Sequence, residues 1–149
     1  MKTEFPALIE SRAGGVFRCH APFPDRALEL AREKLRVVPV RLVATRDKNG
    51  FLNAVAKALE FPEYFGHNWD AFYDCLLELK HGEGDGTLLV LRDASGFARA
   101  EPEEFAAAAD TLADAADYWK DEGKTLLVIV ELEVPTLAPD LPEINYPVT

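Results

Sequence analysis

Two apolar runs, at residues 87–91 and 125–130, stand out in the alternation of hydrophobic and polar positions along the chain. Continuous apolar segments of this length predict strands that are buried on both faces of a mostly parallel sheet. The residues between the two runs can form the crossover, because Pro102 suits a helix start and Gly123 suits a helix end. We therefore expect one long helix between two central strands.

Weaker patterns extend this alternation toward the N-terminus. Residues 37–43 indicate a strand in which Pro39 favours a strand start, a bulge or an edge, because proline cannot donate to a ladder. Residues 15–19 are a short strand candidate, and residues 25–35 have helical spacing. A further helix of about ten residues is expected before Pro62. Its apolar stripe consists of Phe51, Val55, Ala58 and Leu59. Either Asp47 or Asn49 could cap its start.

The whole pattern predicts the α/β class, with helices covering a small, mostly parallel sheet. The sheet would have three core strands, and the N-terminal extension could supply a fourth. We expect residues 1–149 to form a single domain, with an extension at 1–35, a core at 36–133 and a Pro-rich tail at 134–149. The prolines predict a tail that lies extended on the surface or is partly disordered.

The segment that follows Pro62 predicts a helix with two different faces, begun by Asn68 as a plausible N-cap. One stripe has the spacing of a core-facing surface and contains Phe72, Cys75, Leu76 and Leu79. The opposite stripe contains Asp70, Tyr73, Asp74 and Leu77. An aromatic ring and a leucine beside two carboxylates indicate apolar contact area next to fixed negative charge, which suits a basic protein partner.

Composition and charge narrow the expected partners. The 149 residues are 48% hydrophobic and 28% charged, as in an ordinary globular domain rather than a disordered or membrane protein. The net charge is −10, and half of it lies between residues 61 and 86, where six acidic residues accompany one base. This charge repels polyanions, so we expect neither nucleic acid nor a membrane surface as a partner. The N-terminus lacks the features of a secretory signal, which predicts a cytoplasmic protein.

Catalytic and metal chemistry have little support in the sequence. Asp70 and Asp74 could serve a small hydrolase as acid and base, but nothing indicates the pocket that such a pair needs. With His67 they would lie on an open helix face without converging metal ligands. Cys19 and Cys75 lack metal-like spacing, and Cys75 should be a small buried side chain. We expect no enzyme activity, no metal and no cofactor.

The segment at residues 62–76 resembles the barstar family, whose members are intracellular inhibitors of secreted ribonucleases. The resemblance is carried by Pro-Glu-Tyr-Phe-Gly at 62–66, then Asn68, Asp70-Ala71 and Asp74-Cys75-Leu76. The expected order of elements from Val37 to Leu132 is also similar to that family. In barstar-like proteins the acidic helix and the loop before it block the ribonuclease active site. A carboxylate then stands where the RNA phosphate would bind.

The resemblance implies that Asp74 supplies this carboxylate and that Asp70 meets a second basic group. Tyr64 and Tyr73 would give aromatic contacts, while other residues shape the loop. The partner-binding set that follows is Tyr64, Gly66, Asn68, Trp69, Asp70, Tyr73, Asp74 and Leu77. Trp69 lies between the two stripes, so it could also support the core.

The implied function is inhibition of a basic, extracellular-type microbial ribonuclease of the barnase kind. Some positions depart from the family's known inhibitor: Tyr118, beside Asp117, stands where that protein has a contacting acid, and Leu77 and Leu79 replace a smaller polar residue and an aromatic. The alternative is therefore an immunity or adaptor protein that binds another basic toxin or protein through the same helix. The sequence leaves open whether Tyr118 or Asp117 joins the contact surface.

Overall fold

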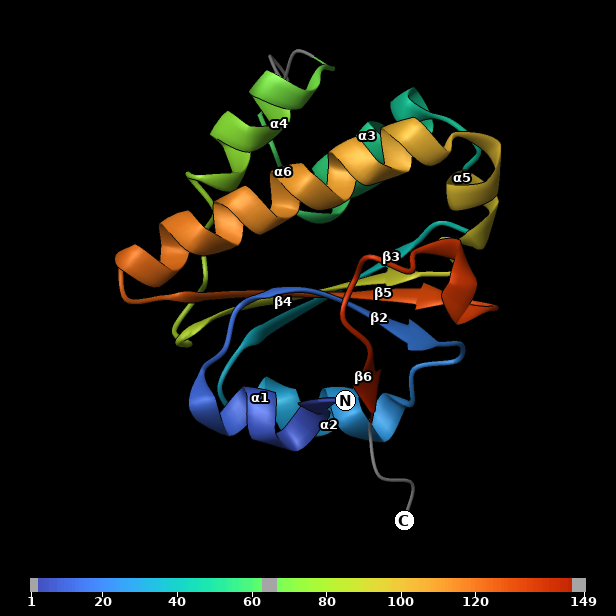
Figure 1. Ribbon diagram of the computed structural model, residues 1–149. Helices are drawn as coiled ribbons and strands as arrows, with labels where there is room; N and C mark the ends of the chain where they lie inside the picture. Colours follow the sequence, from blue (N-terminus) through green and yellow to red (C-terminus); the bar gives the residue numbers. More distant parts are fainter. Residues whose placement is uncertain (1–2, 63–66, 146–149) are drawn as a thin grey trace.

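A computed structural model describes residues 3–62 and 67–145, and its centre is a parallel sheet (Figure 1). Four strands pair in the order β2-β5-β4-β3. They are β2 (Gly15–His20), β3 (Arg36–Arg41), β4 (Gly86–Arg92) and β5 (Thr125–Leu132). The predicted α/β class is confirmed, and the N-terminal candidate strand is the fourth member of the sheet.

Helices cover both faces of this sheet (Figure 1). On one face lie α3 (Lys48–Ala58), α4 (Trp69–Leu76), α5 (Ser95–Ala100) and α6 (Pro102–Asp121). On the other lie α1 (Phe5–Ser11) and α2 (Asp25–Arg32). The core is accordingly split in two: Leu89 and Leu91 of β4 pack with the first group, whereas Leu88 and Val90 pack with the second. This alternation within one apolar strand is what burial on both faces requires.

Local sequence signals explain several element boundaries. Asp47 caps α3, since its side chain accepts a hydrogen bond from the Gly50 amide at 2.7 Å. Asn68 caps α4 in the same way, accepting from the Ala71 amide at 2.8 Å. Pro39 is exposed in β3, which lies at an edge of the four-stranded sheet. The edge position tolerates the missing amide donor.

The structure differs from the sequence-based expectation at both chain ends and in the connection between β4 and β5. Residues 5–11, for which no element was expected, form α1. Between β4 and β5, the short helix α5 precedes the expected long helix, α6. The described tail is not merely a surface segment: after a 3-10 turn at Pro135–Leu137 it reaches β6 (Ile144–Asn145), which pairs in parallel with β1 (Thr3–Glu4). Ile144 is buried in the core beside α1 and α2. The tail can pack because apolar side chains alternate with its prolines.

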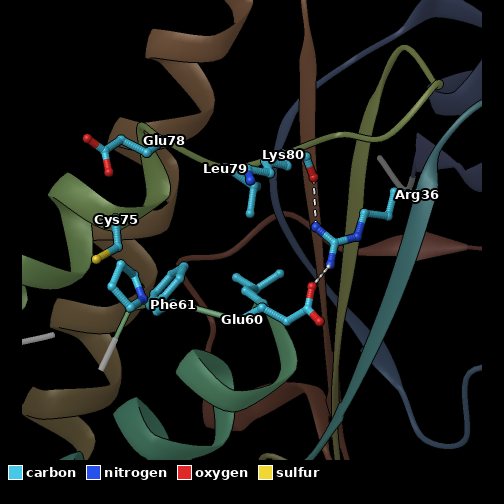
Figure 2. Close-up of a pocket in the computed structure, with 9 residues that line it drawn as sticks. Arg36, Glu60, Phe61, Cys75, Glu78, Leu79 and Lys80 are labelled. Carbon is cyan, nitrogen blue, oxygen red and sulfur yellow. Dashed lines mark hydrogen bonds and ion pairs between the residues drawn. The ribbon is translucent and has the colours of Figure 1, made fainter. Parts of the chain in front are cut away.

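Arg36 ties the edge strand β3 to the turns that follow α3 and α4 (Figure 2). Its guanidinium donates a hydrogen bond to the Lys80 carbonyl at 2.7 Å and lies 3.7 Å from the Glu60 carboxylate. Because Glu60 follows α3 and Lys80 follows α4, one side chain links both connections to the sheet.

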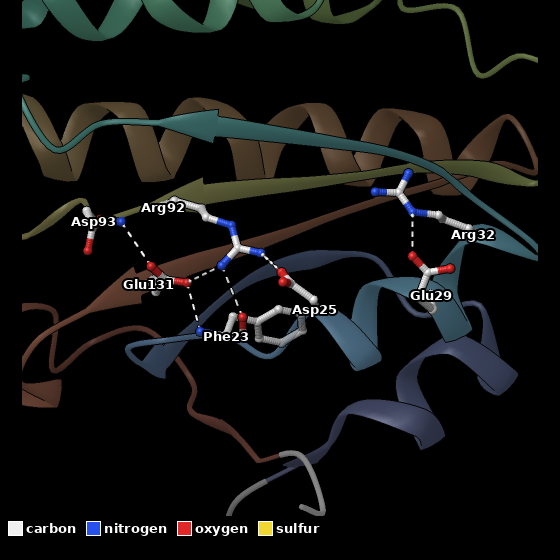
Figure 3. A network of polar contacts seen from close by, with 7 residues as sticks. All are labelled: Phe23, Asp25, Glu29, Arg32, Arg92, Asp93 and Glu131. Carbon is white, nitrogen blue, oxygen red and sulfur yellow. Dashed lines mark hydrogen bonds and ion pairs between the residues drawn. The ribbon is translucent and has the colours of Figure 1, made fainter.

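A buried carboxylate joins three segments at the carboxyl ends of the strands (Figure 3). Glu131 is 2% exposed and accepts hydrogen bonds from the amides of Phe23 at 2.8 Å and Asp93 at 3.2 Å. Arg92 balances its charge at 3.1 Å and also reaches the exposed carboxylate of Asp25 at 3.0 Å. The network fixes the start of α2 against β4 and β5.

We expect Glu131→Ala to lower the free energy of unfolding by about 3 to 5 kcal/mol, because it removes the acceptor of two amides and the buried counter-charge of Arg92. Urea denaturation followed by circular dichroism measures the change. Asp25→Ala is the matched control: its side chain is 94% exposed, so losing this pair should cost no more than about 1 kcal/mol. Equal effects of the two substitutions would contradict a central role for Glu131.

Candidate functional site

Helix α4 presents the two faces that its sequence predicts. Phe72 and Leu76 are fully buried, and Leu79, just beyond the helix, is also buried. The opposite side carries Asp70 and Asp74, which are exposed, with Tyr73 and Leu77, which are half-buried. Polar and apolar groups therefore lie side by side on the outer face of a short helix. We call these four residues, Asp70, Tyr73, Asp74 and Leu77, the α4 face.

The two carboxylates of the α4 face have no neutralising partner in the part of the chain that the structure describes. Within the described residues, neither Asp70 nor Asp74 forms an ion pair. They are four residues apart on one helix, where like charges repel each other by about 0.2 to 0.5 kcal/mol. Asp70 gains some compensation from the helix dipole because it lies in the first turn, but Asp74 does not. The arrangement favours a cation supplied from outside the chain.

A tryptophan holds the N-terminal end of α4. The Trp69 indole nitrogen donates to a Glu104 carboxylate oxygen of α6 at 3.0 Å. Its ring packs against Phe51 of α3 and Phe72 of α4, and Lys48 lies 5.6 Å from the ring centre. The structure thus places this predicted partner contact between α3 and α6, half-buried, where it positions the helix.

A second tryptophan holds the C-terminal end. The Trp119 indole nitrogen of α6 donates to the carbonyl of Leu76, the last residue of α4, at 2.8 Å. The sequence patterns predict the long helix that carries Trp119 but do not predict this role. A signal was available, because indole N–H groups that become buried generally need an acceptor. Both ends of α4 are therefore fixed to α6.

Tyr118 lies on the α6 flank of the α4 face. It is half-buried, its ring packs against Trp119, and its hydroxyl donates to Glu122 at 3.4 Å. Burial, the Glu122 carboxylate and, more weakly, the nearby Tyr73 raise the pKa of Tyr118. Through its contact with Trp119, which is bonded to the last residue of α4, Tyr118 adds an aromatic side chain at the C-terminal end of α4. Asp117 is exposed at the preceding position.

The other flank of α4 borders a hollow of about 230 Å³ (Figure 2). Phe61 and Pro62 line one side of it, and Cys75 and Glu78 line the α4 side. The expectation of a fully buried Cys75 was wrong: the residue is half-buried because it lies at the margin of the core-facing stripe. Burial, Glu78 and Asp74 together raise the pKa of its thiol, which makes it a poor nucleophile.

The remaining predicted site residues divide into two groups. Asn68 is exposed and serves as the α4 cap, and His67 next to it contacts the Asn53 amide oxygen at 2.5 Å. Tyr64 and Gly66 lie outside the described residues. Among residues 3–62 and 67–145, no cluster of three or more His, Cys, Asp or Glu side chains could hold a metal ion.

Fold and site together define a small α/β protein that exposes an acidic, partly apolar helix face. The family model described as Barstar (barnase inhibitor) matches residues 35–131, which is more than half of the chain. The chain therefore belongs to the barstar family, whose members are ribonuclease inhibitors rather than enzymes. A search of curated proteins found no match. In the described part of the chain, every helix is too short or too polar to cross a membrane.

A buried histidine lies beneath the Trp119 anchor. His81 is 7% exposed, and its ring packs edge-to-face with Trp119 at 4.4 Å between ring centres. Its Nδ1 contacts the Thr87 hydroxyl at 2.8 Å, while Nε2 has no hydrogen-bond partner among the described residues. Burial, followed by the charges of Lys124 and Arg36, lowers the pKa of His81.

We expect His81 to make the fold sensitive to acid. Because its pKa is lower in the folded chain than in the unfolded chain, the unfolded state binds more protons as pH falls below about 6.5, and stability is lost. Unfolding free energies measured from pH 8 to pH 5 should fall less steeply in His81→Gln than in the wild type. His20→Gln, at an exposed position, is the control for the loss of a histidine. Identical slopes for His81→Gln and the wild type would rule out this role.

Proposed function

We propose that the protein inhibits a basic, barnase-type ribonuclease by placing the α4 face in the enzyme's active site, without catalysing a reaction itself. The observation that carries this proposal is the pair of exposed, unneutralised carboxylates of Asp70 and Asp74 on a helix fixed at both ends. A ribonuclease must bind the phosphates of RNA, so its active site offers positive charge. A carboxylate can occupy that charge in place of a phosphate.

The anchoring of α4 favours tight binding. Association loses affinity when side chains or loops must become ordered at the interface. Here Trp69 and Trp119 hold the helix to α6, and Phe72 fixes it to the core. The carboxylates are therefore presented on a preformed surface, and the half-buried Tyr73 and Leu77 add apolar contact at low conformational cost.

Charge supports the same partner class. A net charge of −10 attracts a basic protein over a distance set by the ionic strength and mainly raises the association rate. The rest of the predicted contact set, Tyr64, Gly66 and Asn68, would form the loop side of the same surface. We also propose that inhibition takes place in the cytoplasm, where an inhibitor would protect the cell that makes the ribonuclease.

The α6 flank gives a reason to consider a different basic partner. Tyr118 places an aromatic hydroxyl, rather than a carboxylate, on α6, one residue before the Trp119 that holds the end of α4. Together with the half-buried Leu77, it makes this side of the surface more apolar. An immunity or adaptor protein directed at another basic toxin could use the same α4 face. The two functions differ in which protein is bound, not in how α4 acts.

We expect the purified protein to inhibit barnase, and Asp74→Ala to weaken this inhibition by about 2 to 5 kcal/mol, a scale that rests partly on the barnase–barstar pair itself. The reason is that a basic group of the enzyme would then be buried without a partner. Inhibition constants at low and high salt measure the effect, and binding should weaken as salt rises.

Glu10→Ala is the matched control, because it removes one exposed carboxylate from α1 on the opposite face of the sheet. It should leave inhibition nearly unchanged. If the wild-type protein does not inhibit barnase, the ribonuclease assignment fails and the α4 face should be offered to other basic toxins. Hydrolytic turnover by the protein alone that disappears in Asp74→Asn would instead favour an enzyme.

A further inference from the structure

An apolar groove of about 300 Å³ lies between the first half of α6 and the C-terminal tail. Phe105, Ala106 and Ala109 line the α6 wall, and Leu137 and Leu141 line the tail wall. Phe105 is nearly buried, Ala109, Leu137 and Leu141 are half-buried, and Ala106 is exposed. The groove is therefore accessible at its rim and apolar at its base. It lies on the opposite flank of α6 from the residues that contact α4, as helical spacing requires.

The tail wall is preformed by contacts to the sheet. Arg18 of β2 donates from its side chain to the Ala138 carbonyl at 3.0 Å and from its backbone to the Pro142 carbonyl at 2.9 Å. The same guanidinium lies 3.4 Å from the carboxylate of Glu143. Ala138 itself is buried in the core that includes α6. The tail residues of the groove lie after residue 131, where the family match ends, so one wall of the groove comes from a segment outside the match.

The charged side chains that line the groove are all acidic. Its charged lining residues are Asp110 on α6 and Asp140 on the tail, and among the described residues no Lys, Arg or His lines it. Exposed acidic residues continue along the outer surface of α6 through Asp114 and Asp117. At four and seven residues from Asp110, they share its side of the helix and lead toward Tyr118.

We propose that this groove is a second contact site for the same ribonuclease, and that it takes an exposed segment with a Lys or Arg side chain next to an apolar one. The inference rests on the proposed function. The apolar side chain would pack against Phe105 and Leu137, while the cation would lie between Asp110 and Asp140. Apolar walls with carboxylates at the rim complement such a segment and disfavour an acidic one.

The two sites lie within reach of one small protein. Asp110 and Tyr118 are eight residues apart on α6, which corresponds to about 12 Å along the helix axis. A small domain is roughly 30 Å across, so one partner can cover the α4 face and the groove together. A footprint of this kind would combine a charged site that blocks the enzyme with a second site that adds selectivity.

The test is Ala106→Arg, which fills the groove and adds a positive charge where the partner's cation would lie. Arginine has high helix propensity, so α6 should keep its structure. We expect barnase binding, measured by calorimetry on the full chain, to weaken roughly tenfold. Asp110→Asn, a change of charge without a change of shape, should weaken binding in the same direction, with a smaller salt dependence than the wild type.

Ala44→Arg is the matched control, because it adds the same charge at an exposed alanine in the loop after β3. If Ala106→Arg and Ala44→Arg bind barnase equally while Asp74→Ala still weakens binding, the groove inference is wrong and the proposed function stands. If the wild type does not bind barnase, both are wrong. If light scattering shows that the wild type self-associates and Ala106→Arg abolishes this, the groove binds a second copy and the inference is also overturned.

Discussion

The burial of β4 and β5 on both faces is the constraint on which the rest of the molecule depends. All eight residues of β5 are buried, so the protein needs helices above and below the sheet. Helices α3 to α6, within the family match, cover one face, and α1 and α2, which precede the match, cover the other. In β5, Leu127 and Ile129 belong to the core formed with α1 and α2, and β2 pairs with β5 along its free side. Residues 5–32 are therefore an integral part of the fold, because they cover one face of the sheet and extend it by one strand.

The same constraint explains how an eight-residue helix can serve as a binding element. An isolated helix shorter than about 12 to 15 residues is marginal in water. Helix α4 is stable because Phe72 and Leu76 are buried over the sheet and because Trp69 and Trp119 attach its two ends to α6. Tyr73 and Leu77 pack partly against the same core, whereas the exposed Asp70 and Asp74 take no part in this packing. These two positions can therefore vary to suit a partner without loss of the core.

Local sequence patterns predicted most of the sheet, the longer helices and the two exposed carboxylates of α4, because strand burial and helix periodicity are local properties. These patterns did not predict the features whose burial depends on packing between segments that are distant in the sequence. In α1, Phe5, Leu8 and Ile9 have the spacing of a buried helix face, but a helix of seven residues is too short for periodicity alone to identify it. The prolines of the tail suggested exposure, whereas Ile144 and Ala138 find cores formed by other elements. The tryptophan anchors also depend on the approach of α4 to α6, which no local pattern encodes.

The free energies involved show whether the two carboxylates of α4 matter for the stability of the fold. Burying Phe72 and Leu76 contributes about 1.5 to 3 kcal/mol each, whereas repulsion between Asp70 and Asp74 costs about 0.2 to 0.5 kcal/mol. The core therefore tolerates the two carboxylates easily, and neutralising them would improve the fold only slightly. Stability neither requires nor forbids this acidic pair. An anionic face on a helix fixed at both ends is suited to a cationic cleft, which is the partner surface that the proposed function requires.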